Sequence, residues 1–369
     1  MPGNSDPDAT LSRYLDDERF HRTFTLPPND SRPSDTELKV SYADFGHHND
    51  ERVVLFCAPL LGSRYVLTTK DRLARRYGVR VVSPDRPGFG GTTDVEPADR
   101  VRVWLHMVEA LLQHLGIKQV SLIGYSAGSV YAMEMLLHLR HLLHPTHPYV
   151  ALCTPWVNPS RSGVSAMKLL GFLPDALVGS YGRLVQFAYR GFGLAFQFSD
   201  LVGSMPSLGG GSYIVPDADP ADVALEESIF PELASRLQNE ELRGLGKDAL
   251  LLLKHYEFSE NWGAGNDYNT LVPLLAQAEE RLRTGSSDPV MPLQVDVFFA
   301  ESDNMIGNTT APVWFNDCWR PEQRGDFINF NSTTVPKTTH DTILGLRYGV
   351  TERIFQAISN PRVAPSARP

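Results

Sequence analysis

One stretch decides the fold of this chain: Val120-Ser121-Leu122-Ile123-Gly124-Tyr125-Ser126-Ala127-Gly128. An apolar run ends abruptly in Gly-Tyr-Ser-Ala-Gly, and a long helix-forming segment follows it. A strand that turns sharply into a helix needs small residues beside the turn, because the two elements must approach closely. The residue at the turn takes a strained backbone conformation, which exposes its side chain at the end of the strand. The stretch therefore predicts a strand, a sharp turn that presents the Ser126 hydroxyl, and a helix.

Apolar runs alternate with helix-forming segments on both sides of this turn. Strands are expected at 52–57, 79–83, 120–124 and 149–153, and helices at 65–77, 98–115 and 127–143. Two short segments at the start, 24–26 and 38–42, are expected to form antiparallel edge strands. Near-continuous apolar strands are typical of a parallel sheet that helices cover on both faces. The alternation therefore predicts an open, mostly parallel α/β sheet.

The alternation stops between about residues 155 and 285, where the sequence is helical with glycine and proline breaks. It resumes with a strand at 295–300, a short helix at 312–319, a strand at 327–330 and a final helix at 341–358. Eight strands are expected in all, and a helical insertion interrupts them after the sixth. Because open α/β sheets bind ligands at the carboxyl ends of their strands, we expect the insertion to lie over that end as a cap.

The predicted organisation has five parts. They are a flexible lead, the first part of the core, the helical cap or lid, the second part of the core and a frayed tail, at 1–20, 21–154, 155–285, 286–358 and 359–369. Within the cap, we interpret the acidic run 217–241 as a solvated helical face and Gly209-Gly210-Gly211 as a flexible hinge. Large apolar residues are dense between 169 and 198, which predicts the lining of an apolar substrate pocket, with packing inside the cap as the alternative.

Composition restricts the compartment and the partners. Of 369 residues, 42% are hydrophobic and 21% are charged; the net charge is −9 without a basic stripe, so no nucleic-acid partner is expected. The three cysteines lie far apart and form no disulfide framework, which indicates a reducing compartment. The first residues lack the pattern of a secretory signal, and no apolar run reaches ~18 residues. We expect a cytoplasmic protein without stable membrane insertion; nothing in the sequence indicates an oligomeric state.

A serine hydroxyl becomes an effective nucleophile only when a base takes its proton and a carboxylate orients that base. In a sheet of this kind, the acid and then the histidine follow the serine at later strand ends. His340 comes after 331–339, which we expect to be a turn-rich loop, and of eleven histidines it alone has this position. We expect His340 to open the last helix and to act as the base for Ser126.

The acid is expected just after the 295–300 strand. Asp303 follows the end of that strand by a few residues, where its side chain could meet the loop that carries the histidine. Glu301 is the main rival, and Asp296 ranks lower because it lies in mid-strand. The sequence therefore predicts a triad of Ser126, Asp303 and His340.

Acyl transfer also needs hydrogen-bond donors for the oxyanion of its intermediate. One donor is expected to be the backbone N–H of Ala127, directly after the serine. The second is expected in the loop after the 52–57 strand, which reads Ala58-Pro59-Leu60-Leu61-Gly62-Ser63-Arg64. Proline has no N–H to donate. Leu60 is therefore the predicted second donor.

These motifs together resemble the capped α/β-hydrolase superfamily. The stretch Asp85-Arg86-Pro87-Gly88-Phe89-Gly90 matches its D-x-P-G-x-G turn, and Gly124-Tyr125-Ser126-Ala127-Gly128 matches its nucleophile elbow. Asp303 and His340 match its acid and base positions. The resemblance covers about residues 20–358 and implies an α/β-hydrolase fold with a helical cap. It also places Asp85 and Arg86 in a structural loop, where they fix the turn.

Two positions depart from the superfamily pattern. Ala58-Pro59 stands where the family usually carries His-Gly before its oxyanion donor, and Thr339 stands where a glycine usually precedes the catalytic histidine. The family also includes epoxide hydrolases and haloalkane dehalogenases with an aspartate nucleophile, and Ser126 argues against those. The resemblance then implies an esterase, a lipase, a lactonase, a C–C bond hydrolase or a perhydrolase-like enzyme.

We therefore expect a serine hydrolase that cleaves a carboxylic ester or lactone of a small, apolar substrate. The alternatives are a C–C bond hydrolase of a diketone-like metabolite and a small-molecule binding protein without turnover. No cofactor and no metal are expected. Four histidines recur every three residues, but Pro145 and Pro148 break any helix that would make them converge, so we interpret them as a solvated helix end: His138, His141, His144 and His147.

Overall fold

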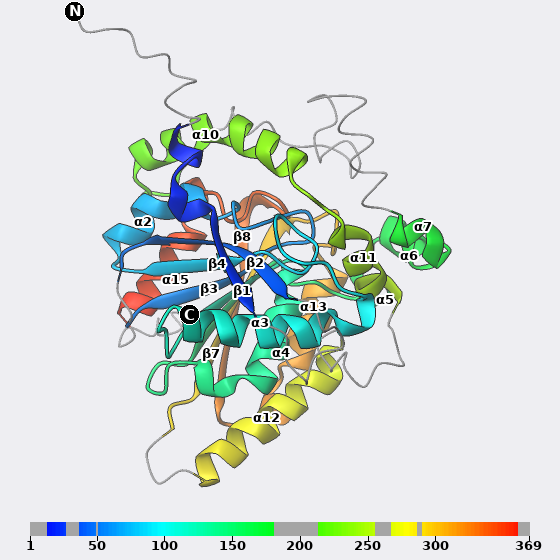
Figure 1. Ribbon diagram of the computed structural model, residues 1–369. Coiled ribbons are helices and arrows are strands. Elements are labelled where there is room, and N and C mark those ends of the chain that lie inside the picture. Colours follow the sequence, from blue (N-terminus) through cyan, green and yellow to red (C-terminus); the bar gives the residue numbers. More distant parts are fainter. Residues whose placement is uncertain are drawn as a thin grey trace, which may run out of the picture.

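The computed structural model describes residues 13–26, 37–48, 51–180, 213–254, 267–285 and 290–360, which are arranged around one sheet (Figure 1). Its eight strands lie in the order β1-β2-β4-β3-β5-β6-β7-β8. β2 runs antiparallel to β1 and β4, and the other neighbouring strands are parallel. The predicted mostly parallel, eight-stranded sheet is confirmed. The strands are β1 Arg22–Leu26, β2 Leu38–Gly46, β3 Val53–Cys57, β4 Arg80–Pro84, β5 Ser121–Tyr125, β6 Tyr149–Cys153, β7 Leu293–Ser302 and β8 Ile328–Thr339.

Helices cover both faces of the sheet, and two buried apolar clusters fill the space beneath them (Figure 1). In β3, Leu55 belongs to the cluster under α3 and α4, whereas its neighbour Val54 belongs to the cluster under α2 and α15. Successive side chains of a strand point to opposite faces. Strands buried on both faces must therefore be apolar throughout, which is why they appear in the sequence as continuous runs. The core helices are α2 Asp71–Arg76, α3 Arg100–His114, α4 Gly128–His138, α13 Thr310–Cys318, α14 Pro321–Arg324 and α15 Val350–Ser359.

Six described helices lie between β6 and β7, in the interval where the insertion is predicted. Helix α10 adds Ile229 to the cluster under α2 and α15, and α12 adds Leu275 to the cluster under α3 and α4. The inserted helices therefore share both apolar clusters with the rest of the chain. The predicted hinge at Gly209–Gly211 lies outside the described residues. The inserted helices are α5 Pro159–Ser162, α6 Ser165–Gly171, α7 Asp175–Gly179, α10 Pro220–Asn239, α11 Gly244–Lys254 and α12 Tyr268–Gly285.

The turn after β4, Asp85-Arg86-Pro87-Gly88-Phe89-Gly90, is in close contact with the insertion. The Gly244 N–H donates to the Gly88 carbonyl at 2.9 Å, and the Gly90 N–H donates to the Glu241 carbonyl at 3.1 Å. A Cβ at Gly88, which has φ +76°, would lie 2.6 Å from the Gly244 nitrogen. Gly88 is thus required by the close approach of α11 as well as by the turn itself, whereas a Cβ at Gly90 would meet Asp85 and Arg64.

β8 is longer than the sequence indicates. The predicted loop 331–339 is wrong, because these residues continue the strand to Thr339 and pair with β7, with a register shift between Ala300 and Ser302. β8 is the last strand of the sheet, and most of its side chains from Asn331 onward are exposed. An edge strand can carry polar side chains and even a proline such as Pro336 without losing its pairing to one neighbour.

The last helix begins later than predicted. The expected helix at 341–358 is confirmed only from Val350 onward, as α15 Val350–Ser359. Before it lie a turn and a short 3₁₀ segment, Leu346–Tyr348, which Gly349 ends with φ +70°. His340 therefore does not open a helix but lies in the turn directly after β8.

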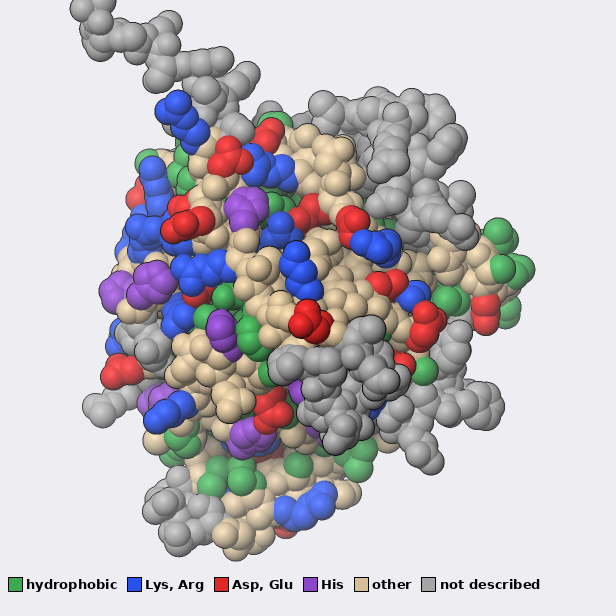
Figure 2. All heavy atoms as spheres, viewed as in Figure 1, with side chains coloured by type: hydrophobic (Ala, Val, Ile, Leu, Met, Phe, Trp, Pro, Cys, Tyr) green, Lys and Arg blue, Asp and Glu red, His purple; other side chains and the backbone are tan. Residues whose placement is uncertain are grey.

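The described surface carries charges of both signs. On the face shown in Figure 2, acidic and basic side chains are interspersed. Among the ion pairs of α2, Arg75 pairs with Asp71 and Arg76 with Asp222. Apolar side chains gather at the right of the view, over α6 and α7. In the turn between these two helices, Phe172 is 84% exposed. Within the described ranges, no helix combines the length and the apolar character that spanning a membrane requires.

The contact between α11 and the turn predicts a position-specific effect of adding one methyl group. A Cβ at Gly244 would lie 2.3 Å from the Pro87 carbonyl oxygen. We expect Gly244→Ala to lower the free energy of unfolding by about 1–3 kcal/mol through overpacking, measured by urea denaturation. Gly285→Ala is the matched control, because a Cβ at that position would have no other atom within 4 Å. Equal stability of the two variants would contradict this account of the contact.

Candidate active site

Ser126 forms the sharp turn between β5 and α4, as the sequence predicts, and it does so with φ 52°. Positive φ is unfavourable for a residue with a Cβ, so neighbouring groups must hold it. The Ser126 N–H donates to the Cys153 carbonyl of β6 at 2.9 Å. The Ser126 carbonyl accepts the N–H groups of Ser129 at 2.9 Å and of Trp156 at 3.2 Å. Both ends of the strained residue are thus fixed by elements on either side of it.

Ser129 is a supporting residue that the sequence analysis did not single out. Its hydroxyl donates to the Ser126 carbonyl at 2.7 Å and accepts the Trp156 N–H at 2.9 Å. The Tyr268 hydroxyl of α12 also donates to it, at 3.3 Å. A serine in the first turn of a helix commonly bonds to nearby backbone groups, and its place three residues after Ser126 is the one available signal.

The two glycines of the motif permit close approach of backbone segments. A Cβ at Gly128 would lie 2.0 Å from the Cys57 carbonyl oxygen and 2.6 Å from that of Ala58. A Cβ at Gly124 would lie 2.8 Å from the Cα of Ser129. The start of α4 is therefore pressed against the loop that follows β3, which brings Ala127 close to the predicted oxyanion loop.

The structure brings the three predicted catalytic side chains together. The Ser126 Oγ lies 2.9 Å from the His340 Nε2, and the His340 Nδ1 lies 2.7 Å from the Asp303 Oδ2. All three residues are buried. With Asp303 ionised, its bond fixes the imidazole proton on Nδ1 and leaves Nε2 free to accept the serine proton. The arrangement can therefore activate the Ser126 hydroxyl as a nucleophile.

Further contacts fix the acid and the base. The other oxygen of Asp303, Oδ1, accepts the backbone N–H groups of Met305 at 2.9 Å and Ile306 at 2.8 Å. The Tyr125 hydroxyl donates to the His340 carbonyl at 2.7 Å, and the two rings are stacked. Because Oδ1 is occupied by backbone N–H groups, Oδ2 is the Asp303 oxygen that bonds to His340. The contacts with Tyr125 restrict the orientation of the imidazole.

The rival acids lie elsewhere. The Glu301 carboxylate accepts the Lys337 N–H at 2.8 Å, between the ends of β7 and β8. The Asp296 carboxylate accepts the Tyr149 hydroxyl at 3.0 Å and also the Gln294 amide. Asp303 is thus the one of the three candidates whose carboxylate contacts His340.

The electrostatic environment favours the charged form of His340. Burial lowers the pKa of the imidazole, but the Asp303 carboxylate, through its charge and its hydrogen bond, together with Asp341, raises it above the ordinary value. A buried imidazolium beside a carboxylate is the species that forms when the serine proton is transferred. The same arrangement that orients the base therefore also stabilises the product of that transfer.

The predicted oxyanion donors, Ala127 and Leu60, lie on the two segments that meet at Gly128. Ala127 precedes the first residue of α4, with φ −53°. Leu60 lies in a turn that the Gly62 N–H closes by donating to the Pro59 carbonyl at 3.0 Å. Neither the Ala127 nor the Leu60 N–H donates a hydrogen bond to another group in the described part of the chain.

The residues of the D-x-P-G-x-G turn make more contacts than fixing the turn requires. Asp85 accepts the Ser41 hydroxyl and the Arg64 N–H, each at 2.6 Å, which is the structural role expected of it. Arg86 turns instead toward the oxyanion loop and donates to the Ala58 and Leu60 carbonyls at 2.5 and 3.0 Å.

The four regularly spaced histidines do not converge on a metal. Among the described residues, no group of three or more histidine, cysteine, aspartate or glutamate side chains could hold a metal ion. His138 pairs with Glu134, and His141 with Glu109. The remaining two, His144 and His147, stack on each other with ring centroids 5.3 Å apart.

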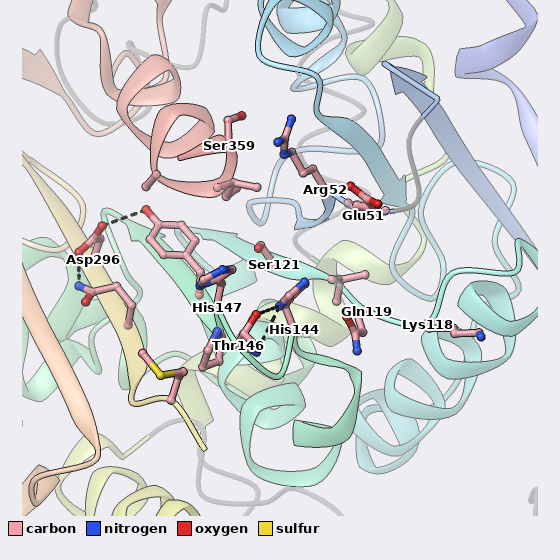
Figure 3. Close-up of a pocket in the computed structure, with 18 of the residues that line it drawn as sticks. Glu51, Arg52, Lys118, Gln119, Ser121, His144, Thr146, His147, Asp296 and Ser359 are labelled. Atoms are coloured by element: carbon pink, nitrogen blue, oxygen red, sulfur yellow. Dashed lines mark hydrogen bonds between the residues drawn. The ribbon is translucent and has the colours of Figure 1, made fainter. Parts of the chain in front are cut away.

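His144 and His147 line a cavity of about 830 Å³ at the other end of β5 from the triad (Figure 3). Ser121, the first residue of β5, is part of its wall, whereas Ser126 follows the last residue of that strand. Figure 3 shows Asp296 and Lys118 at opposite sides of this cavity, with the two histidines between them. The polar groups of this cavity are thus spread out. The predicted triad lies at the opposite ends of the strands, where β5 ends.

Comparison with known proteins agrees with this fold. A sequence model of the alpha/beta hydrolase family matches residues 54–340. The chain therefore belongs to the α/β-hydrolase family, as its motifs indicated. A search of curated protein sequences finds no match.

Solved structures of the same fold include proteins described as an esterase, an epoxide hydrolase and a bromoperoxidase. A thermophilic esterase from Thermogutta terrifontis has a TM-score of 0.52 at 17% identity, over 91% of this chain and 96% of that one. An epoxide hydrolase from Vigna radiata has 0.51 at 15%, over 92% and 96%. A bromoperoxidase from Bacillus anthracis has 0.53 at 13%, over 90% and 99%. At these identities the likeness establishes the fold, and the chain is a hydrolase of this fold by family.

The raised pKa of His340 predicts the pH dependence of the site. His340 must be neutral to accept the serine proton, so kcat/KM should fall as the pH drops through that raised pKa, above the usual value near ~6.5. In Asp303→Asn the lowering effect of burial remains and the carboxylate is gone. The imidazole of that variant should therefore titrate at lower pH, measured from its NMR signals. Identical titration in both proteins would show that Asp303 does not set the pKa.

Proposed function

We propose that this protein is a serine hydrolase that cleaves a carboxylic ester or lactone with an apolar moiety through an acyl-enzyme. One observation carries the proposal: the continuous contact from the Ser126 Oγ to His340, 2.9 Å, and from His340 to Asp303, 2.7 Å. A buried serine, histidine and carboxylate joined in this order are the groups that activate a serine for attack on a carbonyl carbon. The esterase from Thermogutta terrifontis, which has the same fold, is consistent with this chemistry.

In the proposed reaction, the Ser126 Oγ attacks the substrate carbonyl while His340 Nε2 takes its proton. The negative charge moves to the carbonyl oxygen, where the N–H groups of Leu60 and Ala127 stabilise it. The imidazolium then gives its proton to the leaving alkoxide, and the acyl group remains on Ser126. His340 next takes a proton from water, whose oxygen attacks the acyl carbon, and returns that proton to Ser126. Asp303 holds the imidazole throughout.

The compartment and the substrate of the enzyme are also part of what we propose. We place it in the cytoplasm, because Cys57, Cys153 and Cys318 are all free thiols in the fold, as a reducing compartment requires. The substrate we propose is a small apolar molecule, and no step of the reaction needs a cofactor. Leu177 of α7 and Phe172, in the turn between α6 and α7, are exposed apolar residues that are compatible with an apolar ligand reaching the inserted helices.

Replacement of the proposed nucleophile tests this function. Ser126→Ala should lower kcat for a series of p-nitrophenyl acyl esters by at least about 10³-fold, because no acyl-enzyme can form. A fluorophosphonate probe should label the folded wild-type protein at Ser126 and should not label the variant.

Ser228→Ala is the matched control, since this serine is exposed on α10 and its hydroxyl bonds only to its own helix in the described structure. Undiminished ester hydrolysis by Ser126→Ala would overturn the proposal. Absence of labelling in the folded wild-type protein would instead indicate a binding protein without turnover.

A further inference from the structure

Asp248 is a fully buried carboxylate that joins the inserted helices to the core. It lies on α11, and its Oδ2 accepts the Arg86 Nε at 2.8 Å. Its Oδ1 accepts the Tyr131 hydroxyl at 2.6 Å and also bonds to the Arg100 Nε. Burial raises the pKa of Asp248, but the two arginines outweigh it and hold the carboxyl ionised. Removing a charge of this kind from its partners is costly, so its position is strongly determined.

Arg86 connects Asp248 to the predicted oxyanion loop, because it bonds to both. While its Nε bonds to Asp248, its Nη1 and Nη2 donate to the carbonyls of Ala58 and Leu60, at 2.5 and 3.0 Å. The guanidinium also lies 4.3 Å from the centre of the Phe89 ring. A guanidinium is planar and rigid, so fixing one of its edges fixes the direction of the others. Asp248 therefore determines where the two loop carbonyls are held.

These bonds define the direction of the Leu60 N–H. The carbonyls of Ala58 and Leu60 are held by Arg86, and the Pro59 carbonyl between them accepts the Gly62 N–H at 3.0 Å. In a planar trans peptide, the N–H points opposite to the C=O. The Pro59–Leu60 peptide thus points its oxygen at Gly62 and its Leu60 N–H the other way. Three successive peptide groups are fixed in a loop that has no regular secondary structure.

The same carboxylate also contacts the segment that carries the other donor. Tyr131 lies one turn into α4, the helix that begins directly after Ala127. Asp248 therefore bonds to both halves of the predicted oxyanion site, through Arg86 on one side and Tyr131 on the other. We propose that Asp248 is a positioning residue for acyl transfer, which orients the Leu60 and Ala127 N–H groups toward the developing oxyanion. This inference rests on the hydrolase function proposed above.

Asp248→Asn tests the role, because it keeps the shape and a hydrogen-bonding oxygen but removes the charge that holds Arg86. We expect kcat per active site to fall about 10- to 100-fold, with KM nearly unchanged, since misplaced donors weaken binding of the transition state alone. Active sites are counted by the end-point of fluorophosphonate labelling. The affinity for a trifluoromethyl ketone, whose adduct carries an oxyanion, should fall by a similar factor. The acidic limb of the pH profile, which His340 sets, should not move.

Glu279→Gln is the matched control. Glu279 is another buried carboxylate of the inserted helices, and it pairs with Arg140 of the core without touching either donor segment. Its replacement should reduce stability without changing kcat per active site or the ketone affinity. Arg86→Lys is the second test variant, because lysine keeps the charge opposite Asp248 but lacks the planar guanidinium that bonds to Asp248 and to both carbonyls at once. It should reproduce the effects of Asp248→Asn. If Asp248→Asn does not fold, the result for Arg86→Lys decides whether this network positions the donors.

The outcomes separate the two proposals. If the wild-type protein hydrolyses esters but Asp248→Asn and Arg86→Lys keep its kcat per active site and its ketone affinity, Asp248 is merely structural and the inference is overturned. If the wild-type protein neither hydrolyses esters nor labels at Ser126, the hydrolase function and this inference fall together.

Discussion

The left-handed backbone of Ser126 is the constraint on which the rest of the site depends. A residue with a Cβ at φ 52° costs about 1–3 kcal/mol, which surrounding bonds must offset. Here β6, Trp156 and Ser129 supply them, and Gly128 lets the start of α4 lie against the Cys57 and Ala58 carbonyls. The left-handed turn directs the hydroxyl toward His340. Gly128, two residues later, allows the loop after β3 to lie against the start of α4.

Buried charge determines how the inserted helices dock on this framework. Asp248 bonds to Arg86 and Arg100, and Glu279 bonds to Arg140, and both carboxylates are inaccessible to solvent. Buried ion pairs of this kind contribute little net stability, because the loss of hydration offsets their attraction. They are, however, directional, and a misplaced helix would leave a carboxylate without a partner. Apolar contacts hold the insertion in place, and the ion pairs determine which placement is allowed.

The sequence predicted the features that local patterns encode. Continuous apolar runs located the strands, and the glycines around Ser126 located the turn, because both patterns follow from the immediate neighbours of each residue. It failed where a segment takes its structure from a distant partner. The polar residues after Phe330 form a strand because β7 pairs with them, and His340 consequently follows a strand rather than opening a helix. The predicted order of serine, acid and histidine depends only on which strand each residue follows, so the longer β8 does not change it.

Asp248 shows why the support of the site is harder to predict than its reacting groups. Its partners Arg86, Arg100 and Tyr131 are 162, 148 and 117 positions away, and no spacing rule relates them to an aspartate inside a helical insertion. The D-x-P-G-x-G pattern drew attention to Arg86 but predicted only that this residue fixes the turn. The turn also contacts two other segments, because Arg86 donates to the Leu60 carbonyl and the Gly88 carbonyl accepts the Gly244 N–H at the start of α11. One motif therefore serves both the docking of the insertion and the geometry beside the nucleophile, so that a change in the inserted helices is transmitted to the atoms around Ser126.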